Sequence, residues 1–518
     1  MIGRLVLSSR NIYKINIDNK NRSCRKCILL SKNENNENNS DEILIPTNKE
    51  FSPRDEYILL DRSNNIKNVL GQVGNKEDDM NIYHYLYIKD WMSNTQYRKL
   101  WNNYNFEDYD IITRSKSSFT DRIDYYEKVI TIDPDGSIDL DDGFTFKDDE
   151  YYYYLDIHIA DPISYFNLED VTMINIFKEL LLRINTCYIP NTKEANEPIH
   201  LLPSKLVNII SLLEIKKDDI LKYKRALSFM FKINKNTKNV EFQVNPSKLY
   251  NIKNTTYDKY DKKINLDNYK KEIMVNFINL LIDIMQLNYL KINIHEDISH
   301  KMIEIFMIFV NYYSGKYFEN NSYKMIVREQ EKYNNDEDLE SNITIDIKNI
   351  PEYAHQFLNH SANYKFTDTY NNYHYSLGIN NYCHVSSPMR RVIDMINHMI
   401  IYNIDISNIN NMIDINYINN QIKIQKKINN SYELIKFLNN NNTNKFIACI
   451  YDFNLNNDFT NLLLIIYNYE YNFKKIINVE LPLNSNIQLT KFTEFNIELY
   501  YNSINFKSSK FPFSIKIL

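Results

Sequence analysis

Four aspartates lie within ten residues of one another, close enough to share a metal ion. They are Asp133, Asp139, Asp141 and Asp142. Carboxylates at this density cannot all stay ionised in a partly dry site, so either their pKa values rise or a cation balances their charge. Oxygen ligands suit a hard divalent cation, and we expect Mg²⁺, with Mn²⁺ as the second candidate.

Two other interpretations of this segment follow from its turn residues. Pro134 and Gly136 mark a tight turn, and a solvated acidic turn would need no metal. A calcium loop uses a similar alternation of residues, but its required glycine would be at Ile138 and its closing glutamate at Phe144. We therefore expect a strand that ends at Asp133, then a turn, and then an extended acidic segment.

A second polar cluster, at 387–391, reads Ser-Ser-Pro-Met-Arg-Arg when Ser386 is included. Serine followed by proline is typical of a helix N-cap and first helical position, which would place both arginines in the first helical turn. Helix N-termini attract anions, and a guanidinium can give a phosphate two hydrogen bonds. We expect Arg390 to clamp a phosphate and Asp394 to orient it. Ordinary ion pairs are the alternative for both arginines.

Both clusters resemble signatures of one family, the ribonuclease II (RNB) exoribonucleases. The acidic segment is similar to that family's motif at all four aspartates. The segment 382–398 is similar to its second signature, Y-x-H-x-T-S-P-I-R-R-Y followed by D and a later H, with Met389 and Val392 replacing isoleucine and tyrosine. Shorter similarities occur at 158–161 and 299–311, so the resemblance covers residues 120–400.

The resemblance implies a role for each residue of the two clusters. Asp133 and Asp142 would bind the metal directly, and Asp139 would support them. Asp141 would be the carboxylate whose loss harms activity most, and Arg390 would stabilise charge that develops in the transition state. Tyr188 would hold the 3′-terminal nucleotide. The residues that would contact RNA are Tyr188, His384, Ser387 and Arg391.

The resemblance also implies a reaction, the metal-dependent hydrolysis of single-stranded RNA from its 3′ end to nucleoside 5′-monophosphates. Two other functions remain open. The chain could keep the fold and bind RNA without cutting it, as a catalytically weak or inactive regulatory protein. It could also cleave DNA by the same metal chemistry. The intact aspartates argue against the first, and no motif of its own supports the second.

The elements that must position these residues predict an α+β protein. Residues 1–115 contain five short apolar segments, which predict a small β-barrel of the cold-shock or OB type and a linker. Residues 116–415 would form the RNB catalytic domain, a mixed sheet surrounded by helices. Helical periodicity is found at 174–184, 268–290 and 302–313.

The C-terminal residues 416–518 predict a linker and a degenerate OB-like barrel. Asn-rich segments come first, and strand-like segments follow at 446–450, 462–467, 476–481 and 495–501. The family resemblance implies a barrel at this place, although the similarity of the residues is low.

Composition sets further limits on function. The 518 residues carry a net charge of only −5, so phosphate affinity would have to come from local basic residues. Five scattered cysteines fit a reducing compartment. Apolar runs stay shorter than the ~18 residues that cross a bilayer, and no secretory signal is recognisable. We expect a soluble, intracellular, cytoplasmic monomer that binds single-stranded RNA, with no membrane contact and no tether to an exosome.

Overall fold

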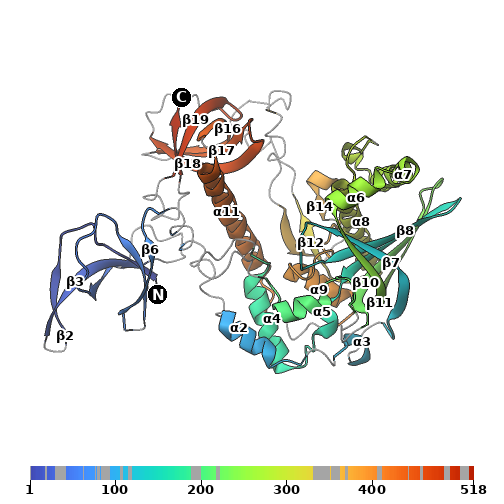
Figure 1. Cartoon of the computed structure of the whole chain (residues 1–518), viewed down its shortest axis with the longest axis horizontal. Helices are drawn as coiled ribbons and strands as arrows, with labels where there is room; N and C mark the ends of the chain where they lie inside the picture. The colour runs from blue at the N-terminus through green and yellow to red at the C-terminus, as the bar shows by residue number, and fades with distance from the viewer. Residues whose placement is uncertain are drawn as a thin grey trace.

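The computed structural model describes most of the chain. The described residues are 2–17, 20–29, 42–61, 63–75, 78, 82, 94–105, 109–114, 119–187, 200–216, 222–293, 295–330, 351, 362–367, 372–404, 411–441, 443–455, 459–482, 490–501 and 513–518. They form an α+β structure in which a closed barrel with helices lies at one end, and an N-terminal and a C-terminal sheet both lie on the other side of the molecule (Figure 1).

The N-terminal sheet contains all five strands expected there and one more. Its strands are β1 (Ile2–Leu5), β2 (Tyr13–Ile17), β3 (Lys20–Leu29), β4 (Glu42–Pro46), β5 (Glu56–Leu60) and β6 (Ile66–Gln72). The order is β2-β3-β1-β5-β6, with β4 paired to β3. A small core of its own, which includes Leu5, Cys27 and Ile58, holds this sheet together.

A closed five-stranded barrel carries the acidic segment. Its strands are β7 (Ile123–Asp133), β8 (Asp142–Asp148), β9 (Tyr152–Ala160), β10 (Lys224–Asn234) and β11 (Val240–Thr256), in the order β10-β11-β7-β8-β9. β11 runs parallel to β7, and Thr256 pairs with Asp133 at the ends of these strands. The next residue, Tyr257, therefore starts a helix beside the first aspartate.

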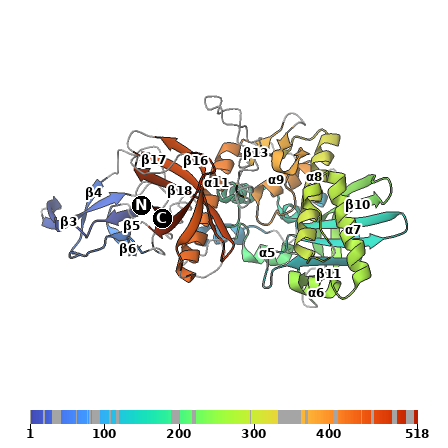
Figure 2. The same ribbon diagram turned by 90° about the horizontal axis from the view of Figure 1, so that it is seen from above.

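Helices pack around this barrel and share one large core with it (Figure 2). They are α2 (Asn94–Asn102), α3 (Ile111–Arg114), α4 (Val171–Arg183), α5 (Ser204–Ile210), α6 (Tyr257–Ile264), α7 (Asn268–Met285), α8 (Ser299–Asn320) and α9 (Val392–Ile401). The three helices expected from periodicity correspond to α4, α7 and α8. Phe306 of α8 packs edge-on against Phe144 of the barrel and Phe277 of α7. Phe277 also packs, tilted, against Phe146 of the barrel, so these rings join the two layers.

Short strands complete the central part next to α8 and α9. They are β12 (Ile326–Glu329), paired with β13 (Asn363–Phe366), and β14 (Tyr373–His374), paired with β15 (Ile379–Asn380). This arrangement brings the chain from β15 along α8 to the arginine cluster.

Helix α8 touches the segment after β15 through a glycine. A Cβ added at Gly315 would lie 2.0 Å from the carbonyl oxygen of Asn381, which is backbone and cannot rotate away. We expect Gly315→Ala to reduce the free energy of unfolding by about 1–3 kcal/mol, because overpacking forces the backbone apart. Urea unfolding would measure it. Glu319→Ala, at an exposed position of the same helix, should change stability by no more than about 0.5 kcal/mol. Equal effects of the two would contradict this packing argument.

The C-terminal sheet contains the four expected strands and a fifth. They are β16 (Lys445–Leu455), β17 (Phe459–Asn468), β18 (Phe473–Pro482), β19 (Glu494–Tyr501) and β20 (Phe513–Ile517), all antiparallel in the order β18-β17-β16-β19-β20. Residues 415–440 fall in the Asn-rich stretch expected as a linker before them. They form one helix, α11 (Ile415–Asn440), which leads from the central part to this sheet (Figure 1).

Asparagine is a poor helix former, but in α11 the apolar residues decide the structure. Ile418 is buried in the central core, whereas Ile428, Leu434 and Ile435 are buried in the C-terminal core. The side chain of Asp414 accepts a hydrogen bond from the backbone of Tyr417 and caps the first turn. One helix therefore connects two cores.

Candidate active site

The acidic residues stand at the end of one barrel strand, in the loop that follows, and at the start of the next strand. β7 ends at Asp133 and β8 begins at Asp142. Between them the N–H of Ser137 donates to the carbonyl of Pro134 (3.2 Å), and Gly136 has a φ of +82°, a conformation that favours glycine. The expected strand and tight turn are thus present. Residues 137–141 carry no regular structure.

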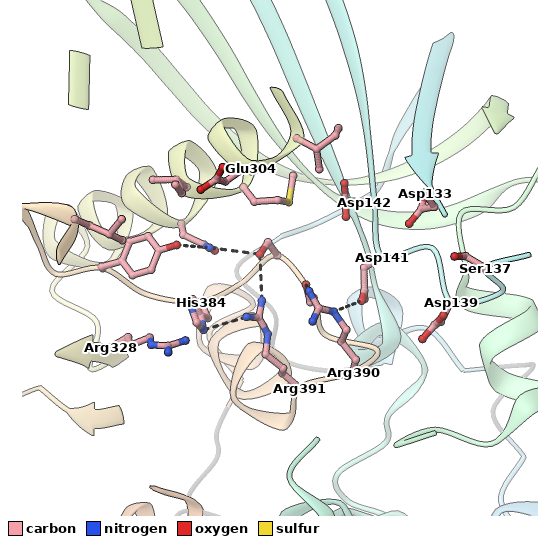
Figure 3. Close-up of a pocket in the computed structure, with 18 of the residues that line it drawn as sticks. Asp133, Ser137, Asp139, Asp141, Asp142, Glu304, Arg328, His384, Arg390 and Arg391 are labelled. Carbon is pink, nitrogen blue, oxygen red and sulfur yellow. Dashed lines mark hydrogen bonds and ion pairs between the residues drawn. The ribbon is translucent and has the colours of Figure 1, made fainter. Parts of the chain in front are cut away.

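All four aspartates line one cavity of about 610 Å³ together with Arg390 and Arg391 (Figure 3). Leu140 fixes the acidic loop from behind, because its N–H donates to the Ser211 hydroxyl (2.9 Å) and its carbonyl accepts from Leu212 (3.1 Å). Asp139 lies more to the side, with its Oδ2 3.7 Å from Nδ1 of His200.

Three of these carboxyl groups have raised pKa values. Burial, followed by the charges of Asp141 and Asp139, raises the pKa of Asp133 to about 7. Burial and Asp133 raise the pKa of Asp142 to about 7. Burial raises the pKa of Asp141 to about 8, although the Arg390 guanidinium opposes the shift. The carboxylates repel one another in a largely buried site, which is the condition under which a cation binds.

The arginine cluster meets the acidic cluster across 248 residues of sequence. The backbone N–H of Met389 donates to Oδ1 of Asp141 (2.9 Å). The Nε of Arg390 lies 3.5 Å from Oδ2 of the same carboxylate, and its Nη2 donates to the Ser387 hydroxyl (2.9 Å). The expected pairing of the two clusters in one site is therefore present.

The expected helix start at Ser387 is wrong. Helix α9 begins at Val392, and residues 387–390 form a turn in which the N–H groups of Arg390 and Arg391 donate to the Ser387 carbonyl (3.3 and 3.1 Å). Arg391 has extended backbone and forms a β-bridge with Asn185, so the chain cannot continue as helix there. The argument from the helix N-terminus does not apply to Arg390.

The expected contact between Asp394 and Arg390 is also wrong. Asp394 is buried, and its Oδ2 accepts hydrogen bonds from the Ser387 N–H (2.8 Å) and from Arg391 Nη2 (2.8 Å). Position 394 faces back under the turn because the helix starts later than expected. Asp394 thus holds the turn that presents Arg390.

Replacing Asp394 with asparagine should destabilise this turn. The Arg391 guanidinium would lose its only carboxylate partner among the described residues while remaining largely buried. Removing one member of a buried ion pair costs about 3–5 kcal/mol. We expect a loss of this order in urea unfolding, together with weaker catalysis. Asp414→Asn, which changes an exposed helix cap, is the matched control and should cost less than about 0.5 kcal/mol, because asparagine caps a helix as well as aspartate does. Equal losses would contradict the role given to Asp394.

The residues expected to contact RNA have mixed outcomes. Ser387, His384 and Arg391 all line the cavity. His384 Nδ1 lies 2.7 Å from the Tyr364 hydroxyl and 3.2 Å from Arg391 Nη1, and burial followed by the neighbouring arginines holds its pKa well below the usual value. Tyr188 lies outside the described residues.

Sequence reasoning missed five lining residues that could contact a ligand. These are Tyr257, Arg328, His374, Tyr382 and Asn311. Asn311 positions the arginine segment, since its Oδ1 accepts from the Val385 N–H (2.9 Å) and its Nδ2 donates to the Tyr382 hydroxyl (3.1 Å). Asn311 and Tyr382 lie in the segments 299–311 and 382–398, which carry the family resemblance, so that signal was available for them.

Tyr257 and Arg328 had no such signal. Tyr257 reaches the site through the parallel pairing of β11 with β7, and its ring stacks on His300 with centroids 3.8 Å apart. Burial and the charges of Asp142 and Asp133 raise the pKa of the Tyr257 phenol to about 12, so it keeps its proton at neutral pH. It can therefore donate a hydrogen bond beside the carboxylates.

Comparison with known proteins identifies a matching family and a relative. The model of the RNB domain matches residues 122–291 and 273–407, which together are more than half of the chain. Ribonuclease R of Chlamydia pneumoniae is 24% identical over an alignment of 358 positions, which covers 59% of this chain and 51% of that protein. The chain thus spans about half the length of this curated relative.

Solved structures share the fold. The apo form of Mycoplasma genitalium RNase R has a TM-score of 0.64 at 14% identity and covers 98% of this chain and 88% of its own. The same protein in complex with ribose methylated single-stranded RNA has a TM-score of 0.63 at 14% identity, with 100% of both chains covered. The Dss1 exoribonuclease of Candida glabrata, an active site mutant, has a TM-score of 0.54 at 19% identity and covers 77% of this chain and 55% of its own.

Within the described residues, no helix combines the length and the apolar character that a bilayer crossing requires.

The family match covers both polar clusters, and the fold agrees along nearly the whole chain. The chain therefore belongs to the RNB family.

Proposed function

We propose that the protein is a metal-dependent exoribonuclease that hydrolyses single-stranded RNA from its 3′ end to nucleoside 5′-monophosphates. One observation carries this proposal most. Asp141 is held by the Met389 N–H and faces Arg390, so that carboxylates and an exposed guanidinium converge on one cavity. Membership of the RNB family and the likeness to a ribonuclease R support the same activity.

The donor set fits a hard divalent cation such as Mg²⁺. Oδ2 of Asp141 is buried and accepts no hydrogen bond among the described residues, and all three perturbed carboxyl groups carry only oxygen donors. No group of three His, Cys, Asp or Glu side chains in the described part of the chain is already close enough to hold one ion. Asp133 and Asp142 would hold it with support from Asp139, and their side chains would have to converge.

A bound cation would neutralise the phosphate and lower the pKa of the attacking water. The protein's own groups would do the rest. Arg390, whose side chain is 44% exposed, would bind a non-bridging phosphate oxygen and stabilise charge as the leaving oxygen departs. Asp141 would keep Arg390 and the Met389 N–H aligned. Ser387, His384 and Arg391 would line the path of the RNA.

The cavity suits the end of a single strand. Its volume of about 610 Å³ falls within the range of about 300–1,000 Å³ typical of pockets for single small ligands. Such a volume can hold a terminal nucleotide but not a duplex. Mycoplasma genitalium RNase R has been solved in complex with ribose methylated single-stranded RNA and with double-stranded RNA, and both complexes support RNA as the substrate class.

Purified protein with Mg²⁺ and a 5′-labelled single-stranded RNA tests this proposal. We expect progressive shortening to a short limit product, release of nucleoside 5′-monophosphates from a 3′-labelled strand, and no cleavage in EDTA. Binding without shortening would instead support the regulatory alternative. Equal cleavage of the matching DNA strand would support a nuclease that does not distinguish the sugar.

We also propose three units with the boundaries expected from the sequence: 1–115, 116–415 and 416–518. Separate apolar cores in the N-terminal, central and C-terminal parts support this division. Helix α2, with Tyr97 and Trp101, packs into the central core, so the linker at the end of the first unit would contact the second. A cytoplasmic monomer stays part of the proposal.

A further inference from the structure

Arg328 is a third arginine in the cavity, and its charge has no acidic partner in the described part of the chain. Arg390 faces Asp141 and Arg391 is paired with Asp394, whereas no ion pair among the described residues includes Arg328. The Nε of Arg328 is buried and has no hydrogen-bond partner there. The guanidinium of Arg328 is therefore a positive charge whose counter-ion would have to come from a ligand.

The position of Arg328 is fixed by its surroundings. It lies on β12, opposite Tyr364 of β13, and its guanidinium stands over the Tyr364 ring at 5.8 Å from the centroid. Its backbone N–H donates to the carbonyl of Tyr382 (2.8 Å). Figure 3 shows Arg328 beyond His384 and Arg391, on the side away from the four aspartates. The cavity thus has an acidic end and a basic end.

Glu304 also lines the cavity, but its carboxylate is paired with Lys301 (2.8 Å), and the titratable groups that interact with Arg328 add no negative charge. His374 lines the same cavity, is 7% exposed, and its Nδ1 has no partner among the described residues. Burial, followed by the charge of Arg328, lowers the pKa of His374 to about 4, so the ring is neutral at neutral pH. Burial, followed by the charge of Arg328, lowers the pKa of Lys426 on α11, so this lysine lies near Arg328. A polyanion is the ligand that fits this end.

We propose that Arg328 binds the phosphate adjacent to the scissile phosphate on its 5′ side. This inference rests on the proposed function, in which Arg390 and the aspartates receive the scissile phosphate. A 3′-terminal nucleotide carries one phosphodiester, which is the one that is cut. A neighbouring phosphate therefore exists only toward the 5′ end, and the strand must extend from the acidic end of the cavity past Arg328.

Substrate length separates this role from the others. A dinucleotide has only the scissile phosphate, whereas a trinucleotide also has the neighbouring one. We expect Arg328→Gln to lower kcat/KM for the trinucleotide by about 10- to 100-fold, the value of a hydrogen bond to a charged group. Hydrolysis of the dinucleotide should stay unchanged, and Arg328→Lys should recover part of the loss because the charge remains.

A neutral linkage gives a second readout. For the unsubstituted chain, a methylphosphonate at the 5′-side linkage of the trinucleotide should lower kcat/KM by the same factor as Arg328→Gln does. For Arg328→Gln, the methylphosphonate should cause no further loss in kcat/KM. Lys365→Gln is the matched control, since it removes one positive charge from the neighbouring strand β13, where Lys365 faces Glu329 at 3.5 Å. Equal losses with both substrate lengths would show that Arg328 supports the pocket or contacts the terminal nucleoside, and would overturn the inference.

Failure of the proposed function would be visible separately. If the unsubstituted chain hydrolyses neither oligonucleotide, affinity for the two replaces the rate as the readout. The chain should then prefer the trinucleotide, and Arg328→Gln should abolish that preference. In Arg328→Gln, the slope of the logarithm of affinity against the logarithm of salt concentration should also be shallower by about 0.7 for each phosphate contact that is lost. An unchanged preference would refute the phosphate contact.

Discussion

Replacing Asp141 with asparagine should lower kcat for RNA hydrolysis by about 10³-fold or more while RNA binding persists. Asparagine has nearly the same volume, and its amide oxygen can still accept the Met389 N–H that now donates to Asp141. It cannot supply negative charge opposite Arg390, nor a carboxylate oxygen for a cation. Rates under single-turnover conditions, with affinity measured in parallel, would separate the two effects.

The same variant should be more stable than the unsubstituted chain when metal is removed. Burial raises the pKa of Asp141 from its usual value of 3.8 to about 8. The folded protein therefore binds this proton more tightly than the unfolded chain does, so stability falls as pH rises from about 4 to about 8. Asparagine has no proton to lose. Thermal unfolding in EDTA should show a smaller loss of stability between pH 5 and pH 8 in Asp141→Asn.

Asp135→Asn is the matched control for both measurements. Asp135 is exposed in the same loop and does not line the cavity. It should leave activity and the pH dependence of stability nearly unchanged. A variant at Asp141 that is inactive and also less stable in EDTA at pH 8 would point to misfolding. Full activity in Asp141→Asn would contradict the proposed chemistry.

The acidic segment could be predicted well because its geometry is local. Asp133 and Asp142 are held by two adjacent strands joined by one turn, and both the turn residues and the strand end are visible in the chain. The meeting with Arg390 is not local and could be inferred only through the family resemblance. No periodicity or spacing connects Asp141 with Met389, the neighbour of Arg390, which lies 248 positions later.

Long-range pairing explains what the sequence could not predict. Tyr257 reaches the site because β11 lies parallel to β7 in a closed barrel, and Arg328 because β12 pairs with β13. The start of α9 was misplaced because the bridge between Arg391 and Asn185 overrides the capping preference of Ser387 and Pro388. Tertiary contacts placed Tyr257 and Arg328 where no local signal indicated them, and they set the start of α9 against the local capping signal.

Arg390→Ala should lower kcat by about 10²–10³-fold and change RNA affinity far less. Arg390 is the partly exposed arginine of the cluster, and it faces the one carboxylate that touches both motifs. Its contribution would grow as charge develops on the phosphate, which affects kcat more than ground-state binding. Arg390→Lys should recover only part of the rate, because an ammonium cannot give two parallel hydrogen bonds to a phosphate.

Arg391→Ala supplies the contrast, since the neighbouring arginine has a different environment. Its guanidinium bonds to Asp394, Ser386 and His384 and is largely enclosed. Truncation would leave Asp394 buried without a cation, so the unfolding free energy should fall by about 3–5 kcal/mol. Arg390→Ala, by comparison, should unfold at nearly the same urea concentration as the unsubstituted chain. If Arg391→Ala were stable but inactive and Arg390→Ala unstable, the two roles would have to be exchanged, and Arg391 would become the group that binds the scissile phosphate.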